Sequence, residues 1–252
     1  MSWRSTGVAC TSADLNSRLW LQKYIGKYIA SGTWQDIKSL YPNFQVMEVT
    51  DLLTRVQLAD ASATSSIISN YTAVSTLLFS FSGSLDDFGA YLDTFQNYAL
   101  KNPTLLSPKI KEAILMAVAD ALFPLVGSLS VQVTEEWLNR ISFLLPAINS
   151  TILGEIPLAI SCDKYQLFVT AFDGVYNSLK STTKQDIATF QKSFLVNKYT
   201  MEEDGCSLGT SSTASYIQNN IGLFCKQFTA AEVIQFNPAI SEVSFTEFCN
   251  LS

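Results

Sequence analysis

The sequence contains no histidine among its 252 residues. Histidine is the commonest general base, a frequent zinc ligand and the side chain that titrates near neutral pH. Serine–histidine and cysteine–histidine nucleophile systems are therefore excluded. The eleven glycines are scattered, so they form neither a phosphate-binding loop nor a dinucleotide-binding loop.

Other patterns that mark catalysis or metal binding are missing as well. The chain has no C-x-x-C pair, no calcium-binding loop and no G-x-S-x-G nucleophile elbow. Acidic residues adjoin at 86–87, 135–136 and 202–204. We expect helix starts or turns at these places, where capping and solvation account for the carboxylates. The sequence therefore predicts a protein that is not an enzyme and that has no cofactor or metal site.

Charge and hydropathy narrow the choice of partner. The net charge is −6 and the basic residues form no run, so nucleic acid and anionic membrane surfaces are poor partners. The most apolar stretch, 113–126, contains an aspartate and a proline and falls short of the roughly 20 residues that a transmembrane helix needs. The first thirty residues do not resemble a signal peptide, and the C-terminus lacks the tail of a lipid-anchor signal.

Residues 10–56 and 206–252 are two copies of one sequence unit, which align without a gap at a separation of 196 positions. Internal repeats of this kind are typical of stacked repeat architectures. The identical positions are Cys10 and Cys206, Gln22 and Gln218, Ile25 and Ile221, Gly26 and Gly222, Thr33 and Thr229, Pro42 and Pro238, and Thr50 and Thr246.

Apolar residues recur at three- and four-residue spacing along most of the chain, which predicts an all-α fold of about twelve to fourteen short helices. Helix N-caps are expected at Thr33 with Asp36, at Thr54, and at Thr183 with Asp186. The pattern predicts helices that include 12–30, 33–40, 45–53, 64–81, 84–100, 107–122, 134–145, 161–180 and 183–196, with 128–133 extended or a loop.

Many short helices, joined by brief loops and spaced by prolines, favour a right-handed superhelical stack of the armadillo or HEAT type over a four-helix bundle. No low-complexity linker interrupts the chain. We therefore expect residues 1–252 to form a single helical-repeat α-solenoid domain, whose second repeat unit is incomplete.

The repeat also suggests how the five cysteines pair. Cys225 and Cys249 stand where the first copy has Ile29 and Leu53, and the joint change of two core-like positions suggests a disulfide between them. If Cys162 then joins Cys206, Cys10 stays unpaired, as in a fragment cut from a longer array. The alternative is five reduced thiols in a cytosolic protein.

Three N-x-[S/T] sequons, at Asn70, Asn149 and Asn250, are potential N-glycosylation sites. Together with the expected disulfides, they favour an extracellular protein, either secreted or a cell-surface ectodomain.

Four short segments together carry a resemblance to a known family. They are LLTRVQLA at 52–59, WLNRISFLLP at 137–146, IPLAISCDKY at 156–165, and GC at 205–206 followed by YIQNNIG at 216–222. These segments resemble the repeats of mesothelin-like vertebrate proteins, a superfamily that includes mesothelin, stereocilin and otoancorin. The resemblance implies an extracellular glycoprotein built as a superhelix of armadillo-like helical repeats, which acts in cell adhesion or protein binding and has no catalytic residues.

We therefore expect a non-enzymatic extracellular binding or adhesion module whose partner is a protein or a glycan. The alternative is a structural, self-associating unit of an extracellular matrix, egg coat or mucus layer. A hydrolase is a third and weaker hypothesis, which would require two carboxylates to converge in a cleft.

Overall fold

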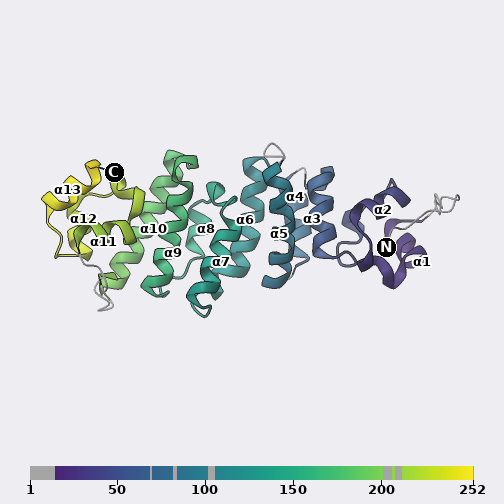
Figure 1. Ribbon diagram of the computed structural model, residues 1–252, viewed down its shortest axis with the longest axis horizontal. Helices are drawn as coiled ribbons and strands as arrows, with labels where there is room; N and C mark the ends of the chain where they lie inside the picture. Colours follow the sequence, from purple (N-terminus) through teal and green to yellow (C-terminus); the bar gives the residue numbers. More distant parts are fainter. Residues whose placement is uncertain are drawn as a thin grey trace. The chain divides into compact units, whose positions relative to one another are not determined.

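The computed structural model describes residues 15–68, 70–81, 84–101, 106–200, 206–207 and 212–251. Every regular element in these ranges is an α-helix or a 3-10 helix, and the ranges contain no β-strand (Figure 1). The all-α prediction is confirmed. Across the same ranges, no helix combines the length and the apolar character that crossing a bilayer requires.

The chain divides into two compact units, residues 1–117 and 118–252. In the first unit, α3 packs against α5 and α2 packs against α3. The single-domain and superhelical arrangements stay predictions. The elements of the first unit are α1 (Ser17–Tyr24), η1 (Gly26–Ser31), α2 (Trp34–Leu40), η2 (Val46–Glu48), α3 (Arg55–Thr64), η3 (Ser66–Ile68), α4 (Tyr71–Phe79), α5 (Leu85–Lys101) and the larger part of α6 (Pro108–Leu122).

In the second unit, α7 packs against α9, α8 packs against α10, and α9 and α10 contact the elements of the second sequence copy. The elements that follow α6 are η5 (Phe123–Leu125), α7 (Val131–Ile141), η6 (Leu145–Ala147), α8 (Ser150–Gly154), α9 (Cys162–Val175), η7 (Tyr176–Ser178), α10 (Ser181–Thr200), α11 (Thr213–Asn220), η9 (Gly222–Gln227), α12 (Ala230–Phe236) and α13 (Glu242–Leu251).

The two sequence copies fold alike over their first three elements. Elements α1, η1 and α2 match α11, η9 and α12 residue for residue, at the same offset of 196 that aligns the sequences. In each copy, a threonine before the third element forms a capping box with an acidic residue, Thr33 with Asp36 and Thr229 with Glu232. The sequence repeat is therefore also a structural repeat.

A glycine in the left-handed conformation begins the second element of each copy. Gly26 has φ +55° and Gly222 has φ +61°, values that L-amino acids with a side chain rarely adopt. The predicted helix over 12–30 is wrong for this reason: α1 ends at Tyr24, and the 3-10 helix η1 begins at Gly26. Residues 12–14 lie outside the described part of the chain.

The copies diverge after their third element. The predicted helix over 45–53 is wrong, because the first copy has only the short 3-10 helix η2 there, whereas the second copy has the longer helix α13. Tertiary bonds explain the difference. The Gln45 N–H donates to the Ser17 hydroxyl at 2.7 Å, and the Ser17 N–H donates to the Glu48 carboxylate at 3.0 Å.

Three further predictions of secondary structure need correction. The helix expected over 64–81 is broken, and a new helix starts after Asn70, whose side chain caps α4. The stretch 128–133, expected to be extended or a loop, is helical in its second half, because Ser130 caps α7, which begins at Val131. Helix α10 begins at Ser181, two residues before the expected cap Thr183, which is buried within the helix.

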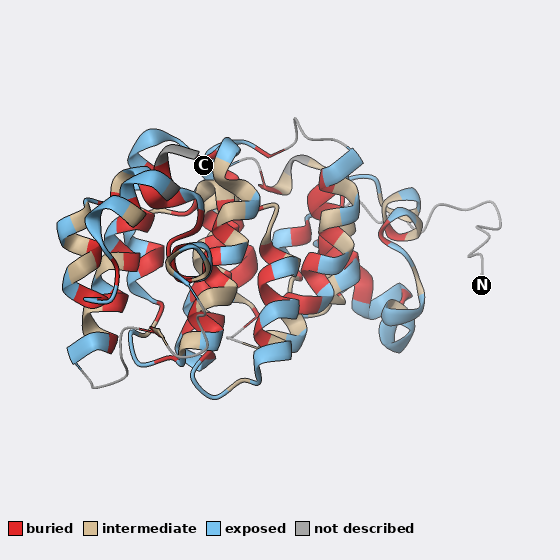
Figure 2. Ribbon diagram, turned by 60° about the vertical axis from the view of Figure 1, so that its left-hand side comes forward, coloured by how far each residue is buried: buried red, intermediate tan, exposed pale blue. Residues whose placement is uncertain are grey.

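Both units bury their apolar residues on the helix faces that turn towards neighbouring helices (Figure 2). Aromatic rings form much of this core. In the first unit, Tyr91 stacks on Phe95 with ring centroids 5.4 Å apart, and in the second unit Tyr165 stacks on Phe194 at 4.0 Å. Such pairs contribute about 0.5–1.5 kcal/mol beyond the burial of their area. The Tyr165–Phe194 pair therefore helps to hold α9 against α10.

Candidate functional site

Two disulfides lie in the second unit. Cys162, at the start of α9, pairs with Cys206, and Cys225 of η9 pairs with Cys249 of α13; the Cα–Cα distances are 5.5 Å and 5.6 Å. These are the two pairs that the sequence suggested. Cys10 lies outside the described residues.

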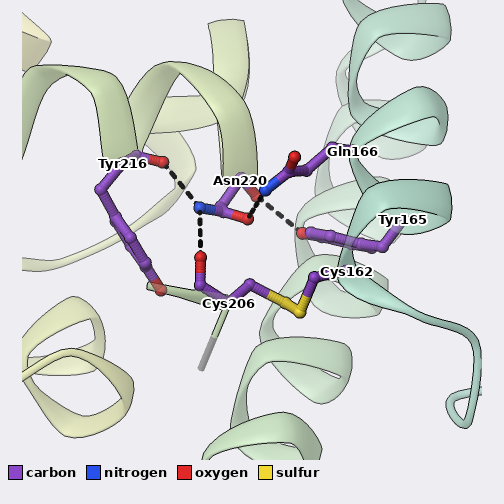
Figure 3. The surroundings of a disulfide bond; sticks show 6 residues. All are labelled: Cys162, Tyr165, Gln166, Cys206, Tyr216 and Asn220. Atoms are coloured by element: carbon purple, nitrogen blue, oxygen red, sulfur yellow. Dashed lines mark hydrogen bonds between the residues drawn. A yellow bond between two sulfur atoms is a disulfide. The ribbon is translucent and has the colours of Figure 1, made fainter. Parts of the chain in front are cut away.

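A buried hydrogen-bond network surrounds the first disulfide (Figure 3). Its centre is Asn220, which is fully buried at the end of α11. The Asn220 amide donates to the carbonyl oxygens of Tyr216 (3.0 Å) and Cys206 (3.4 Å), and its side-chain oxygen accepts from Gln166 (3.2 Å). The Tyr165 hydroxyl donates to the Asn220 carbonyl oxygen at 2.6 Å. Helix α9 is therefore joined to the second copy by polar bonds and by a covalent bond.

A second link joins α9 to η9. The Asp173 carboxylate accepts a hydrogen bond from the backbone N–H of Leu223 at 2.8 Å. This N–H lies in the first turn of η9, where backbone donors lack partners within the helix. A Cβ atom on the preceding residue, Gly222, would collide with the same carboxylate. Glycine is thus required here both for its φ angle and for the approach of Asp173.

Burial raises the pKa of Asp173 to about 6, although the hydrogen bond from Leu223 acts in the opposite direction. A raised pKa in a partly buried carboxyl is also a property of general acids. At Asp173, however, the carboxylate is bound to the backbone, which is a structural role. Sequence reasoning missed this residue. The repeated glycine at 26 and 222 signals the left-handed backbone that both copies share, whereas the contact with Asp173 occurs at Gly222 and not at Gly26.

A buried lysine also has a structural role. The ammonium of Lys164 donates to the carbonyl oxygens of Val126 and Gly127 at 2.9 Å and 2.8 Å. Its side chain is 9% exposed. Cations at the C-terminal end of a helix stabilise unpaired carbonyl groups, so Lys164 closes the end of η5.

The sequon residues Asn70 and Asn149 are both helix N-caps. Their side-chain oxygens accept from the N–H of Ala73 at 2.9 Å and of Ile152 at 3.0 Å. A glycan is attached to the side-chain nitrogen, so glycosylation leaves the capping oxygen in place. Asn70 is exposed and Asn149 is half-buried. Asn250 belongs to α13, and its side chain lies outside the described part.

A groove of about 280 Å³ opens between α8 and α10 in the second unit. The hydroxyls of Thr189 and Ser193 donate to helix carbonyl oxygens, which leaves their oxygen lone pairs as acceptors. The groove can therefore receive hydrogen bonds from a ligand beside an apolar surface. Its lining residues are Ser150, Leu153, Gly154, Ile156, Leu158, Asp186, Thr189, Phe190 and Ser193.

The described residues contain no group of three or more cysteine, aspartate or glutamate side chains that could hold a metal ion. Comparison with known proteins adds no assignment, since no family model, curated protein or solved structure matches the chain.

Proposed function

We propose that the protein is a non-enzymatic extracellular binding or adhesion module, built as a mesothelin-like α-solenoid. The observation that carries the proposal is the pair of disulfides that tie the second repeat copy together and join it to α9. Structural disulfides persist in oxidising compartments and are rare in the cytosol. The two capping asparagines, which can carry glycans without loss of their caps, support the same location.

The groove between α8 and α10 is the surface that we propose for a glycan or an extended peptide. Its acceptor oxygens on Asp186, Thr189 and Ser193 suit the hydroxyl and amide donors of such ligands. The neighbouring Leu158 is 37% exposed and offers an apolar contact for a sugar ring or an aliphatic side chain. A mixture of apolar lining and a few convergent polar groups is typical of ligand sites.

The test uses the full chain, exported from mammalian cells behind a cleavable signal and screened on a glycan array and a panel of extracellular proteins. We expect a ligand whose binding is lost in Leu158→Asp. Val131→Asp is the matched control, because Val131 is 41% exposed in the same unit and does not line the groove. Equal binding by both variants, or the absence of any ligand, would contradict this proposal.

The alternative, a self-associating matrix unit, makes a different prediction in solution. A matrix unit would assemble as its concentration rises, whereas a binding module would stay monomeric. Light scattering against concentration separates the two functions.

A further inference from the structure

The first repeat copy exposes an aromatic face that the second copy buries. Tyr28 is 62% exposed, whereas its counterpart Phe224 is 0% exposed. Tyr24 is 37% exposed and its counterpart Asn220 is 0% exposed. We refer to Tyr24 and Tyr28 as the copy-1 face.

The second copy shows what covers such a face. Its element η9 packs against both α9 and α10, and α11 packs against α9. Tyr176, which follows α9, packs edge-on against Phe224 with ring centroids 5.1 Å apart. The Tyr165 hydroxyl donates to the carbonyl oxygen of Asn220. The counterparts of Tyr24 and Tyr28 are therefore buried by a pair of consecutive helices.

The polar groups that this helix pair binds in the second copy have counterparts in the first copy. Lys192 of α10 forms an ion pair with Glu232 at 2.8 Å, and Asp36 takes the place of Glu232 in an equivalent capping box. Asp173 of α9 accepts from the N–H that follows Gly222, and Gly26 gives η1 the same left-handed start. The first copy thus has a carboxylate and the start of a 3-10 helix at the two positions through which the second copy binds α9 and α10.

We propose that the copy-1 face is a docking surface for a helix pair of the α9–α10 type. The partner has a tyrosine and a carboxylate near the end of its first helix and a lysine in its second helix, at the spacing of Asp173, Tyr176 and Lys192. The chain's own helix pair is already occupied by the second copy, so the partner pair belongs to another polypeptide segment. This surface is distinct from the groove between α8 and α10.

The first test measures binding of a fluorescent peptide, residues 161–200 with Cys162→Ser, to the full chain by fluorescence anisotropy. We expect saturable binding that Tyr28→Ser weakens by about tenfold or more, since buried aromatic anchors dominate interfaces. Tyr24→Ser should weaken it too. Phe79→Ser is the matched control, because Phe79 is 87% exposed on α4 and lies outside the copy-1 face. The peptide variant Tyr176→Ser should bind less tightly.

The second test covers weak binding by the free peptide. The same 40-residue segment is joined to the N-terminus of the full chain by a flexible Gly/Ser linker, which gives an effective concentration of about millimolar. We expect slower hydrogen exchange over 17–31 in the fusion, and no such change when the fusion carries Tyr28→Ser. Failure of both tests would overturn the proposal. Self-association of the chain would also overturn the proposal if Tyr28→Ser abolishes the dimer and the peptide does not displace it. The occupant of the copy-1 face would then be a second copy of the chain.

Discussion

Alanine at the two matched glycines should separate backbone strain from a steric clash. Gly26 and Gly222 have nearly equal φ angles, +55° and +61°, and a side-chain-bearing residue in this conformation costs about 1–2 kcal/mol. A Cβ atom at Gly26 meets no other atom within 4 Å, whereas one at Gly222 collides with the Asp173 carboxylate. Both substitutions therefore introduce backbone strain, and only Gly222→Ala also introduces a steric clash.

The size of the difference follows from the hydrogen bond that the clash breaks. Gly26→Ala should destabilise the fold by about 1–2 kcal/mol. Gly222→Ala must also displace Asp173 from the N–H of Leu223, and a hydrogen bond to a charged group contributes about 1.5–3 kcal/mol. Because Asp173 is partly exposed to solvent, we take the lower part of that range and expect about 2–4 kcal/mol for Gly222→Ala in total.

Chemical denaturation measures both costs, and hydrogen exchange assigns them to residues 16–31 or 212–227. A double-mutant cycle between Gly222→Ala and Asp173→Ala isolates the clash, since the methyl group of alanine leaves room for the new Cβ. We expect a coupling of about 1 kcal/mol or more. Equal costs at the two glycines, together with additive effects in the cycle, would refute the contact between Asp173 and η9.

Three further predictions concern charge, cross-links and glycans. Asp173 has a folded-state pKa of about 6 against an ordinary value of 3.8. Between pH 3.8 and pH 6 the folded state therefore binds more protons than the unfolded state does, so this residue lowers the stability of the fold as pH rises. The free energy of unfolding of Asp173→Asn should therefore rise by about 1 kcal/mol relative to that of the wild type between pH 4 and pH 7, after allowance for solvent screening. A difference in denaturation midpoint that stays constant over this pH range would contradict the prediction. Removal of the Cys225–Cys249 bridge by a double serine substitution should lower stability by about 2–4 kcal/mol, which calorimetry under non-reducing conditions can measure. Thr72→Ala should abolish a glycan on Asn70 while stability stays unchanged, whereas Asn70→Gln should lose the glycan and about 1 kcal/mol of capping energy; mass spectrometry and thermal unfolding distinguish these results.

Helix caps and a first-turn proline, which are short-range sequence signals, predicted part of the fold correctly. The caps at Thr33 and Thr54 were predicted correctly, because each forms a capping box with a residue three positions later. Helix α6 also begins as expected, with Pro108 in its first turn. These features depend on a few neighbouring residues, so the sequence alone contains the necessary information.

Features that depend on distant residues were not predictable in the same way. The segment 45–53 has a helical pattern, yet bonds to Ser17 hold it in another conformation. Asp173 looks like an ordinary solvated residue of a helix until the fold places Leu223 beside it. The groove between α8 and α10 likewise depends on the packing of helices more than thirty positions apart in the sequence. Sequence periodicity reports which face is buried, and not what lies against it.

The cysteine pairing, by contrast, was suggested by comparing one copy of the repeat with the other. Two core positions changed to Cys225 and Cys249 together, and a joint change of this kind reports a contact in space. The same comparison gives the copy-1 face its expected partner.

The most direct test of an extracellular function is peptide mapping, without reduction, of the protein from its native source. We expect four cysteines in two cross-linked pairs, Cys162 with Cys206 and Cys225 with Cys249. Five free thiols in protein from its native source would contradict an extracellular binding module held together by disulfides.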